Sequence, residues 1–496
     1  MRWTLAEVAE ALGVAPPSGL NAVARLAGVS IDSRTIGAGQ LFFAIHGPRH
    51  DGHVFVGSAM ERGALAAVVD GDRLESYTDA VRGKLFGVAD TTAALGQLAR
   101  AVRRAWGWPL AGVTGSIGKT TTKEILAALL AARFRVLKSE GNLNNEYGLP
   151  LMLMRLEETQ KAAVLEMGMS RAGELSRLAK IAEPNVGVVT RVAPVHLEFF
   201  KSLDEIAAAK RELIEGLAGE APVAVLNADD ARVTAFAKIA RGPVLTFGFA
   251  PGANFRAEAV EDHGALGSAF RFTSPSESAY LQLPLAGRHA ISNALAAMAA
   301  ASVWGINAAD AKRVFPTLRP ANMRGEVLRF DDGLALINDC YNSSPVALAA
   351  AIQLLGATPG FDRRILTAGE MLELGVSSAE LHRECGQRAA EAGNIDWIIG
   401  VQGDAAEIVY GAVHAGHPQA RTRFFSSSEE AAKFVLGLVK ARDLVLVKGS
   451  RGTKMERIVE ALLAERTPNA SASMTGTRSG SGPSGTGFTG TGEGAQ

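Results

Sequence analysis

The chain has 496 residues, 47% of them hydrophobic and 21% charged, which is typical of a soluble globular protein of about two to four domains. Its 51 basic side chains balance its 51 acidic ones, so charge favours neither nucleic acid nor an anionic membrane as a partner. Two cysteines, Cys340 and Cys385, are too few for a disulfide framework and suit a reducing compartment.

The two ends of the chain differ in composition. Residues 1–13 place Glu7 and Glu10 among apolar side chains, which predicts an amphipathic helix and not a signal peptide. Residues 467–496 are mostly Gly, Ser and Thr, so we expect a tail that buries too little apolar surface to order. No run reaches the roughly 18 apolar residues of a membrane-spanning helix, which predicts a cytoplasmic protein that does not insert into membranes.

Three folded units are expected between these ends. Residues 1–85 mix short strands and helices, with one strand at 40–45. Residues 86–318 alternate strands with helices, which predicts a mostly parallel sheet wrapped by helices, with strands at 109–113, 162–165, 186–190, 223–226 and 244–247. Strand-like pieces at 255–260, 269–273 and 279–283 predict a small β excursion before a helix near Asn293.

Residues 319–466 repeat the alternation and predict a second, Rossmann-like α/β unit. Its expected strands are 334–338, 365–367, 397–401, 423–425 and 444–447. The unit lacks a G-x-G-x-x-G motif after its first expected strand, so we assign it no dinucleotide.

A phosphate-binding loop is the clearest chemical signal. Val113-Thr-Gly-Ser-Ile-Gly-Lys-Thr-Thr121 joins an apolar strand to a helix-like run, the context that such a loop needs. Gly115 and Gly118 permit a tight path, Lys119 supplies a positive charge to the phosphates, and the Thr120 hydroxyl is placed to bind Mg²⁺. The generic motif has glycine where this chain has Val113, so an ordinary glycine turn before a helix is the competing interpretation.

Two strand ends bring further polar groups to the same rim of the expected sheet. Glu166 ends the strand at 162–165, where ligands bind in α/β sheets, and its carboxylate suits Mg²⁺. His196 follows the strand at 186–190. Taken alone, Glu166 is equally well explained as a strand-end carboxylate, and His196 as a structural histidine.

Local sequence leaves several other residues open. Lys210 reads as a solvated helix lysine, and Asn293 either contacts an adenine edge or lies near a helix N-terminus. Ser33 and Arg34 could contact a diphosphate or lie in a solvated turn. The polar clusters at 338–345 and 447–451 end strands of the third unit and are either sites or turns.

Taken in chain order, these segments resemble the Mur ligase family, whose T-G-x-x-G-K-T loop needs no glycine at position 113. The resemblance spans residues from about 30 to 455 and rests on a set of matches in the family's order: Asp32-Ser-Arg34, Thr114–Thr120, Gly141-Asn-Leu-Asn-Asn145, Glu166-Met-Gly168, His196-Leu-Glu198, Gly287-Arg-His289 with Asn293, Arg324-Gly325, Asp339–Pro345, Gly369–Gly375 and Lys448-Gly-Ser-Arg451.

Within the family, the motifs most resemble members that add D-alanyl-D-alanine to UDP-N-acetylmuramoyl-tripeptide with ATP and Mg²⁺, through an acyl phosphate. The resemblance implies a three-domain α/β architecture: a UDP-substrate domain (1–85), a central P-loop ATPase-like domain (86–318) and a C-terminal Rossmann-like domain (319–466). A monomer acting on these small molecules is expected. Cys340, Asn338 and Ser343-Ser344 depart from the family's usual residues and concern acceptor binding.

The resemblance also implies roles for individual residues. The ATP-binding set is Gly115, Ser116, Ile117, Gly118, Lys119, Thr120, Thr121, Asn293, Arg324 and Asp339. The metal-binding set is Thr120, Glu166, His196 and Lys210, with Lys210 at the position of the family's carbamylated lysine. Lys119, Lys210, His196 and Glu166 are the expected catalytic residues. The substrate-binding set is Ser33, Arg34, Asn142, Asn144, Asn145, Tyr341, Asn342, Lys448 and Arg451.

Two alternatives remain at this point. A ligase with another acceptor, diaminopimelate or glutamate on folate, is disfavoured by the missing D-N-P-R motif and by the Asp32-Ser-Arg34 match respectively. A P-loop NTPase that only hydrolyses nucleotide would usually show paired acids after its second strand, whereas Glu166 is followed by Met167.

Overall fold

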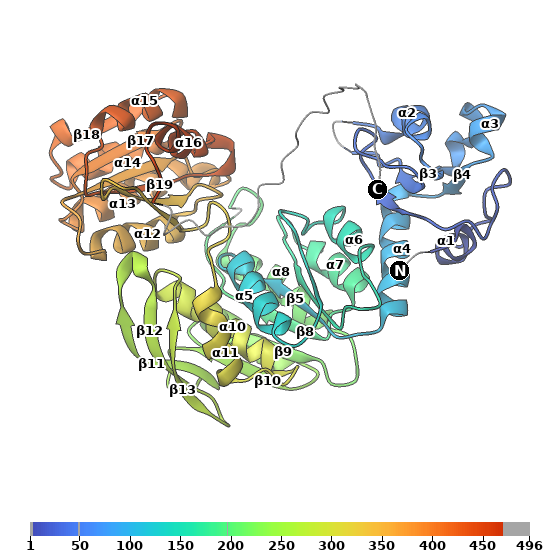
Figure 1. The fold of residues 1–496 in the computed structure, drawn as a ribbon, viewed down its shortest axis with the longest axis horizontal. Helices are drawn as coiled ribbons and strands as arrows, with labels where there is room; N and C mark the ends of the chain where they lie inside the picture. Colours follow the sequence, from blue (N-terminus) through green and yellow to red (C-terminus); the bar gives the residue numbers. More distant parts are fainter. Residues whose placement is uncertain (1–2, 48–49, 196, 470–496) are drawn as a thin grey trace, which may run out of the picture.

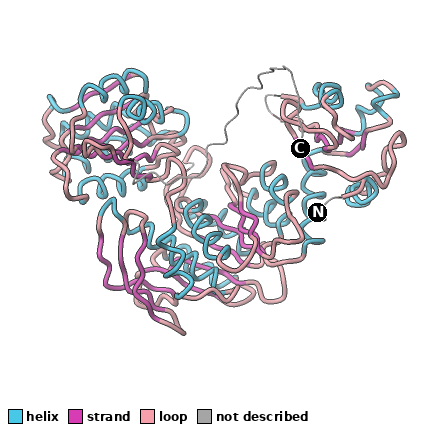
Figure 2. The backbone as a smooth tube through the Cα atoms, in the orientation of Figure 1, coloured by secondary structure: helices cyan, strands magenta, loops and turns pink. Residues whose placement is uncertain are grey.

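The structure is a computed structural model that describes residues 3–47, 50–195 and 197–469. The described chain contains three β-sheets of four, nine and six strands, which follow one another along the sequence. The units that carry the first and third sheets lie at opposite ends of the unit that carries the second (Figure 1). Figure 2 shows helices on the outside of each sheet. The predicted α/β fold with mostly parallel sheets is confirmed.

The N-terminal unit is built on a small parallel sheet in the order β1-β2-β3-β4. Its elements are α1 (Leu5–Leu12), β1 (Gly28–Ser30), β2 (Gln40–Phe43), α2 (Val56–Glu61), β3 (Ala66–Asp70), α3 (Asp79–Arg82) and β4 (Leu85–Val88). The expected amphipathic helix is α1, which Thr4 and Glu7 cap reciprocally at its start and which ends at Gly13 with φ 67°. Because β4 pairs with β3, the first sheet continues to Val88, beyond the expected boundary at residue 85.

Helix α4 (Thr91–Trp106) connects the first unit to the second. Its first half packs Leu95 and Leu98 into the core of the N-terminal unit. Its second half packs Val102 and Trp106 into the core of the central unit. A single continuous helix therefore belongs to both cores and couples the two units mechanically.

The central sheet has the strand order β13-β12-β11-β10-β9-β8-β5-β7-β6. Its strands are β5 (Leu110–Thr114), β6 (Val136–Lys138), β7 (Ala162–Glu166), β8 (Val186–Val189), β9 (Val223–Asn227), β10 (Val244–Gly248), β11 (Phe255–Asp262), β12 (Ser268–Thr273) and β13 (Ser278–Leu283). The chain goes from β5 to β6 and β7 on one side and to β8 on the other, so the topological switch point lies beside β5. The expected β excursion is the antiparallel end of this same sheet.

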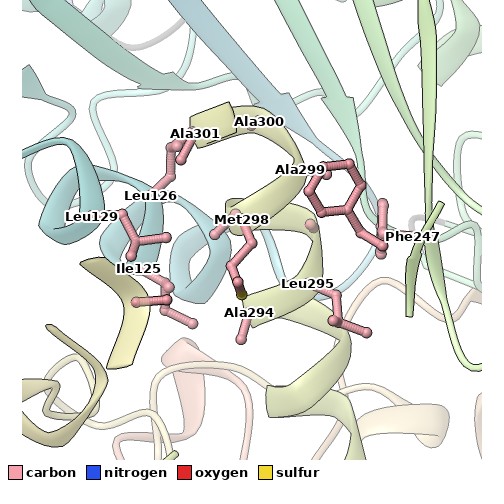
Figure 3. Close-up of a cluster of buried hydrophobic side chains, with 14 of the residues drawn as sticks. Ile125, Leu126, Leu129, Phe247, Ala294, Leu295, Met298, Ala299, Ala300 and Ala301 are labelled. Atoms are coloured by element: carbon pink, nitrogen blue, oxygen red, sulfur yellow. The ribbon is translucent and has the colours of Figure 1, made fainter. Parts of the chain in front are cut away.

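Helices cover both faces of the central sheet: α5 (Lys119–Ala131), α6 (Gly148–Leu153), α7 (Glu174–Ala182), α8 (Leu203–Glu215), α9 (Ala231–Thr234), α10 (Arg288–Ser302) and α11 (Ala308–Val314). On one face, α10 lays small alanines and Met298 against Leu126 and Leu129 of α5, with Phe247 of β10 beside them (Figure 3). On the other face, α6, α7 and α8 enclose a second core. This packing fixes the start of α5 at the carboxyl end of β5.

The C-terminal sheet has the order β14-β15-β19-β16-β17-β18 and is parallel except for β14. Its elements are β14 (Glu326–Arg329), β15 (Ala335–Asp339), α12 (Pro345–Ala357), β16 (Arg363–Gly369), α13 (Ser378–Glu391), β17 (Trp397–Val401), α14 (Ala405–His414), β18 (Thr422–Phe425), α15 (Ser428–Leu438), β19 (Asp443–Lys448) and α16 (Glu456–Glu465). The interpretation of 334–338 as the first strand of this unit was wrong, because the half-buried β14 precedes it.

Two further expectations concern membrane-spanning helices and the C-terminal tail. None of the helices among the described residues combines the length and the apolar content needed to cross a bilayer. Most of the expected disordered tail, residues 470–496, lies outside the described residues. Its first residues lie beside β14, where Asn469 N–H donates to the Arg329 carbonyl at 2.8 Å.

Candidate ATP and ligation site

The phosphate-binding loop lies between β5 and α5, at the switch point of the central sheet. Gly115 and Gly118 adopt φ values of 148° and 90°, which favour glycine. A Cβ at Gly115 would lie 1.9 Å from Thr190 Oγ1, and one at Gly118 would lie 2.3 Å from Asn293 Oδ1. Both glycines are therefore needed for conformation and for space.

Residues after β8 hold this loop from one side. Thr190 Oγ1 donates to the Ile117 carbonyl at 2.6 Å, and Ser116 N–H donates to the Arg191 carbonyl at 2.7 Å. Asn227, at the end of β9, donates to the Thr190 carbonyl at 2.6 Å. Sequence reasoning did not single out Thr190 or Asn227, although both are polar residues at strand ends.

Lys119, at the first position of α5, folds back over the loop. Its Nζ donates to the Gly115 carbonyl at 2.7 Å and lies 3.4 Å from the Ser116 carbonyl. Burial lowers the pKa of Lys119; the positive charge of Arg324 acts in the same direction, and Glu166 opposes both. The ammonium thus lies between the loop and the carboxylate that ends β7.

Glu166 joins the loop to the predicted substrate segment. Its Oε2 accepts from the Thr120 hydroxyl at 2.8 Å, and its Oε1 accepts from Asn144 Nδ2 at 3.0 Å. Gly168 makes room for Asn144, because a Cβ there would lie 3.0 Å from the Asn144 amide. The structure therefore brings Thr120, Glu166 and Asn144 together, as their predicted roles require.

This donor set fits Mg²⁺. One carboxylate and one hydroxyl are hard oxygen ligands, and Mg²⁺ is commonly held by few protein groups plus substrate phosphates. Among the described residues, no three His, Cys, Asp or Glu side chains form a cluster suited to a metal held by protein alone. Thr120 and Glu166 are the residues that would hold the ion.

Lys210 is not a solvated lysine, so the interpretation from local sequence was wrong. Its side chain lies in the buried face of α8 and is 1% exposed. Burial, together with the like charge of Lys119, lowers its pKa well below the ordinary value. A lowered pKa makes the Lys210 ammonium lose its proton more readily, and an uncharged amine is the nucleophile that carbamylation requires.

His196 lies outside the described residues, but its neighbours show where this segment runs. Leu197 packs against the cores of both the central and the C-terminal units. The Cβ position of Gly375 lies 3.7 Å from the Leu197 carbonyl and from the Glu198 backbone. The segment after β8 therefore meets the predicted Gly369–Gly375 motif at the boundary between two units.

Two residues expected at the nucleotide approach the loop from different elements. Asn293, on α10, is buried with its amide against Gly118. Arg324 begins the C-terminal unit, and its guanidinium carbon lies 4.0 Å from the centroid of the Tyr341 ring. Since the Arg324 charge affects Lys119, the C-terminal unit contributes to the electrostatics of the loop.

The C-terminal polar clusters meet at the ends of adjacent strands. Lys448, at the end of β19, donates to Asp339 Oδ2 at 2.6 Å and to the Asn342 carbonyl at 2.9 Å. Cys340 is buried, and burial raises its pKa, so it is not a ready nucleophile. The competing interpretation of these clusters as ordinary turns does not explain why the buried Lys448 ammonium pairs with the half-buried Asp339 carboxylate.

The remaining predicted substrate residues have local partners. Arg451 forms an ion pair with Glu456 at 3.0 Å. Ser33 is buried, whereas the Arg34 side chain is 84% exposed and pairs with Asp32 at 2.8 Å. Hydrogen bonds from Arg34 lower the pKa of Asp32 to about 2.

The asparagines of the Gly141–Asn145 motif have different surroundings. Asn145 Oδ1 accepts from Gly148 N–H at 2.9 Å and so supports the start of α6. Asn142 is exposed, and its carbonyl accepts from Asn144 N–H at 2.8 Å. Of the three, Asn144 is the one whose side chain donates to the Glu166 carboxylate within the described residues.

Comparison with known proteins identifies related chains over nearly the whole length. Models of three domain families match: the Mur ligase family catalytic domain at 25–103, the Mur ligase middle domain at 113–301, and the Mur ligase glutamate ligase domain at 323–451. UDP-N-acetylmuramoyl-tripeptide–D-alanyl-D-alanine ligase from Bacillus subtilis is 34% identical over 439 residues, which cover 88% of this chain and 93% of that protein. The enzyme of the same name from Haemophilus influenzae is 33% identical, with the same coverage of 88% and 93%.

Solved structures agree with these relatives. A crystal structure of MurF from Acinetobacter baumannii superposes with a TM-score of 0.83 at 29% identity, covering 94% of this chain and 99% of that one. MurF from Thermotoga maritima in complex with ADP gives a TM-score of 0.77 at 29% identity and covers 88% and 97% respectively.

Proposed function

Because this chain belongs to the Mur ligase family, we propose that it is an ATP-dependent amide ligase that joins D-alanyl-D-alanine to UDP-N-acetylmuramoyl-tripeptide. The supporting relatives carry that activity in their names and align with 88% of the chain. We further propose that the protein acts as a monomer in the cytoplasm, in the synthesis of peptidoglycan precursors.

One observation carries the proposal furthest: a single carboxylate, Glu166, contacts both the ATP loop and the Gly141–Asn145 segment. Thr120 donates to one of its oxygens at 2.8 Å and Asn144 to the other at 3.0 Å. An enzyme that only hydrolyses ATP has no need to connect its metal ligand to a second substrate's segment. A ligase must bring the γ-phosphate to a substrate carboxylate, so it needs this connection.

The proposed chemistry begins with a carboxylate, which is a poor electrophile. Transfer of the γ-phosphoryl group to the tripeptide carboxylate gives an acyl phosphate and ADP. The neutral amine of the dipeptide then attacks the acyl carbon and loses a proton as the C–N bond forms. The C–O bond to the phosphate breaks, and phosphate leaves with that oxygen and its electron pair. Mg²⁺, when bound, screens the repulsion between triphosphate and carboxylate. Positioning of reactants is worth about 7–11 kcal/mol in favourable cases, so most residues act by holding groups in place.

The proposed roles of individual residues are those that the family resemblance implies. Lys119 binds the β- and γ-phosphates, and residues 115–121 wrap them with backbone N–H groups. Thr120 and Glu166 bind one Mg²⁺, and His196 with carbamylated Lys210 binds a second. Asn293 contacts adenine, Arg324 a phosphate and Asp339 the ribose. Ser33 and Arg34 bind UDP, and Asn142, Asn144 and Asn145 line the path of the UDP-linked substrate. The other substrate-binding residues are Tyr341, Asn342, Lys448 and Arg451.

Phosphate release tests the function directly. The protein is given ATP, Mg²⁺ and UDP-N-acetylmuramoyl-tripeptide with D-alanyl-D-alanine, with diaminopimelate or with no acceptor. We expect stoichiometric phosphate and amide product with the dipeptide only, and loss of both in Lys119→Ala. Equal turnover without acceptor would indicate an NTPase and refute the ligase assignment; preference for diaminopimelate would redirect it to another acceptor.

A further inference from the structure

A serine hydroxyl replaces a backbone carbonyl in the ladder beside the predicted metal ligand. Ser139 follows β6, and its N–H donates to the Val164 carbonyl of β7 at 3.0 Å. In a regular parallel ladder, Glu166 N–H would then donate to the Ser139 carbonyl. Instead, Glu166 N–H donates to Ser139 Oγ at 2.9 Å. The backbone of Glu166 is therefore held by a side chain.

The displaced carbonyl has a partner of its own. Lys123 Nζ, from the helix that follows the ATP loop, donates to the Ser139 carbonyl at 2.7 Å. Lys123 is 1% exposed and Ser139 is 2% exposed, so neither bond competes with bulk water. Burying an ammonium is costly unless it is paired, and Glu124 completes the pairing at 2.9 Å. None of the roles proposed above uses Lys123 or Ser139.

These bonds connect three elements around Glu166. Helix α5 is connected through Lys123, the segment from residue 139 to 145 through Ser139 and Asn144, and β7 through Glu166 itself. The Asn144 carbonyl also accepts from Gly168 N–H at 2.9 Å, so the segment is attached to the β7 end at both of its ends. Movement of Ser139 would thus move the carboxylate relative to Thr120.

We propose that Ser139 and Lys123 are positioning residues that fix the Glu166 carboxylate for divalent-cation binding and transmit the position of α5 to the substrate segment. The inference rests on the proposed function in one respect, that Glu166 binds the cation together with ATP. Ser139 acts by accepting a hydrogen bond from Glu166 N–H at its hydroxyl, and Lys123 acts by providing a donor for the Ser139 carbonyl, which this arrangement displaces from the ladder.

Cation binding tests the inference without requiring turnover. The probe is Mn²⁺ with a non-hydrolysable ATP analogue, followed by electron paramagnetic resonance, and amide hydrogen exchange at Glu166 is measured in parallel. Ser139→Ala should weaken Mn²⁺ binding by about 10–100-fold, as loss of groups that orient metal ligands does, and should speed exchange at Glu166. Ser139→Thr keeps the hydroxyl and should restore both. Lys123→Met should shift both in the same direction as Ser139→Ala.

A matched control separates positioning from the loss of any buried serine. Ser268, in β12, is 3% exposed, and its hydroxyl has no hydrogen-bond partner within the described part of the chain. Ser268→Ala should leave Mn²⁺ affinity and Glu166 exchange unchanged. Wild-type Mn²⁺ affinity in both Ser139→Ala and Lys123→Met would overturn this inference and leave the proposed function standing. Absence of Mn²⁺ binding by the unaltered protein with the analogue would overturn the proposed function as well.

Discussion

Gly118 shows at the scale of one residue why the loop sequence is demanding. Its φ of 90° and the 2.3 Å that separates a Cβ there from Asn293 Oδ1 impose two independent constraints. Gly118→Ala should therefore displace either the loop or Asn293 and lower kcat/KM for ATP by about 100-fold or more, comparable to losing a key transition-state donor. Steady-state kinetics with varied ATP measures this.

Gly173 provides the matched control for backbone strain alone. Its φ is 85°, nearly that of Gly118, but nothing lies within 4 Å of a Cβ at that position. Gly173→Ala should cost about 1–2 kcal/mol of stability and leave kcat/KM for ATP intact. Equal kinetic damage in the two variants would mean that strain, not the contact with Asn293, accounts for the loss.

Burial of Lys210 should lower the free energy of unfolding of the protein. Its folded pKa is lowered well below the unfolded value of about 10.4. At pH values below the unfolded pKa, the unfolded chain binds more protons than the folded one, so Lys210 lowers the free energy of unfolding. This loss of stability disappears only as the pH rises toward the unfolded pKa. Lys210→Met should raise the thermal unfolding midpoint, more near pH 7 than near pH 10, while turnover is lost.

Calorimetry in carbonate-free buffer at about pH 7 and about pH 10 measures this difference. The control is Lys180→Met on α7, where the lysine is exposed and should yield no such pH-dependent gain. If Lys210→Met destabilised the protein equally at both pH values, the lowered pKa of Lys210 would not be the source of the pH-dependent penalty that we infer.

At the scale of elements, the spacing of apolar residues along a helix predicts which side chains are buried better than the short motif around one residue does. The buried face of α8 includes Ile206, Leu213 and Ile214 together with Lys210, at the spacing of an amphipathic helix. The burial of Lys210 was therefore predictable from the helix that surrounds it. The loop residues 115–121 were predictable for another reason, because phosphate chemistry and backbone geometry both restrict their types.

Other features could not be read from the sequence because they depend on contacts between distant segments. The bond between Ser139 Oγ and Glu166 N–H joins residues 27 positions apart and needs the register of β6 on β7. Strand β14 has no alternation of buried and exposed residues, and its pairing partner β15 makes it a strand. The shared helix α4 likewise became visible only when two cores were assembled around it.

At the scale of the molecule, the C-terminal unit meets the central one along a boundary formed by separate connecting segments. Leu197 packs on both cores, and a Cβ at Gly264 would lie 2.9 Å from Thr358 at the end of α12. The Arg324 charge extends to Lys119 across the same boundary. Units of one chain that meet at such a boundary commonly move relative to one another, and such motion is common where substrates must be enclosed before reaction.

We therefore predict that ligands compact the molecule. A single globule of this length has a radius of gyration of about 23 Å, and the arrangement in Figure 1, with two units at opposite ends of a third, should exceed it in solution. Small-angle scattering with Mg²⁺, a non-hydrolysable ATP analogue and UDP-N-acetylmuramoyl-tripeptide should show the radius falling toward that value, because proposed ATP contacts come from two units. Arg324→Ala should keep the unliganded radius and reduce the change. An unchanged radius with saturating ligands would show that the site is complete without closure.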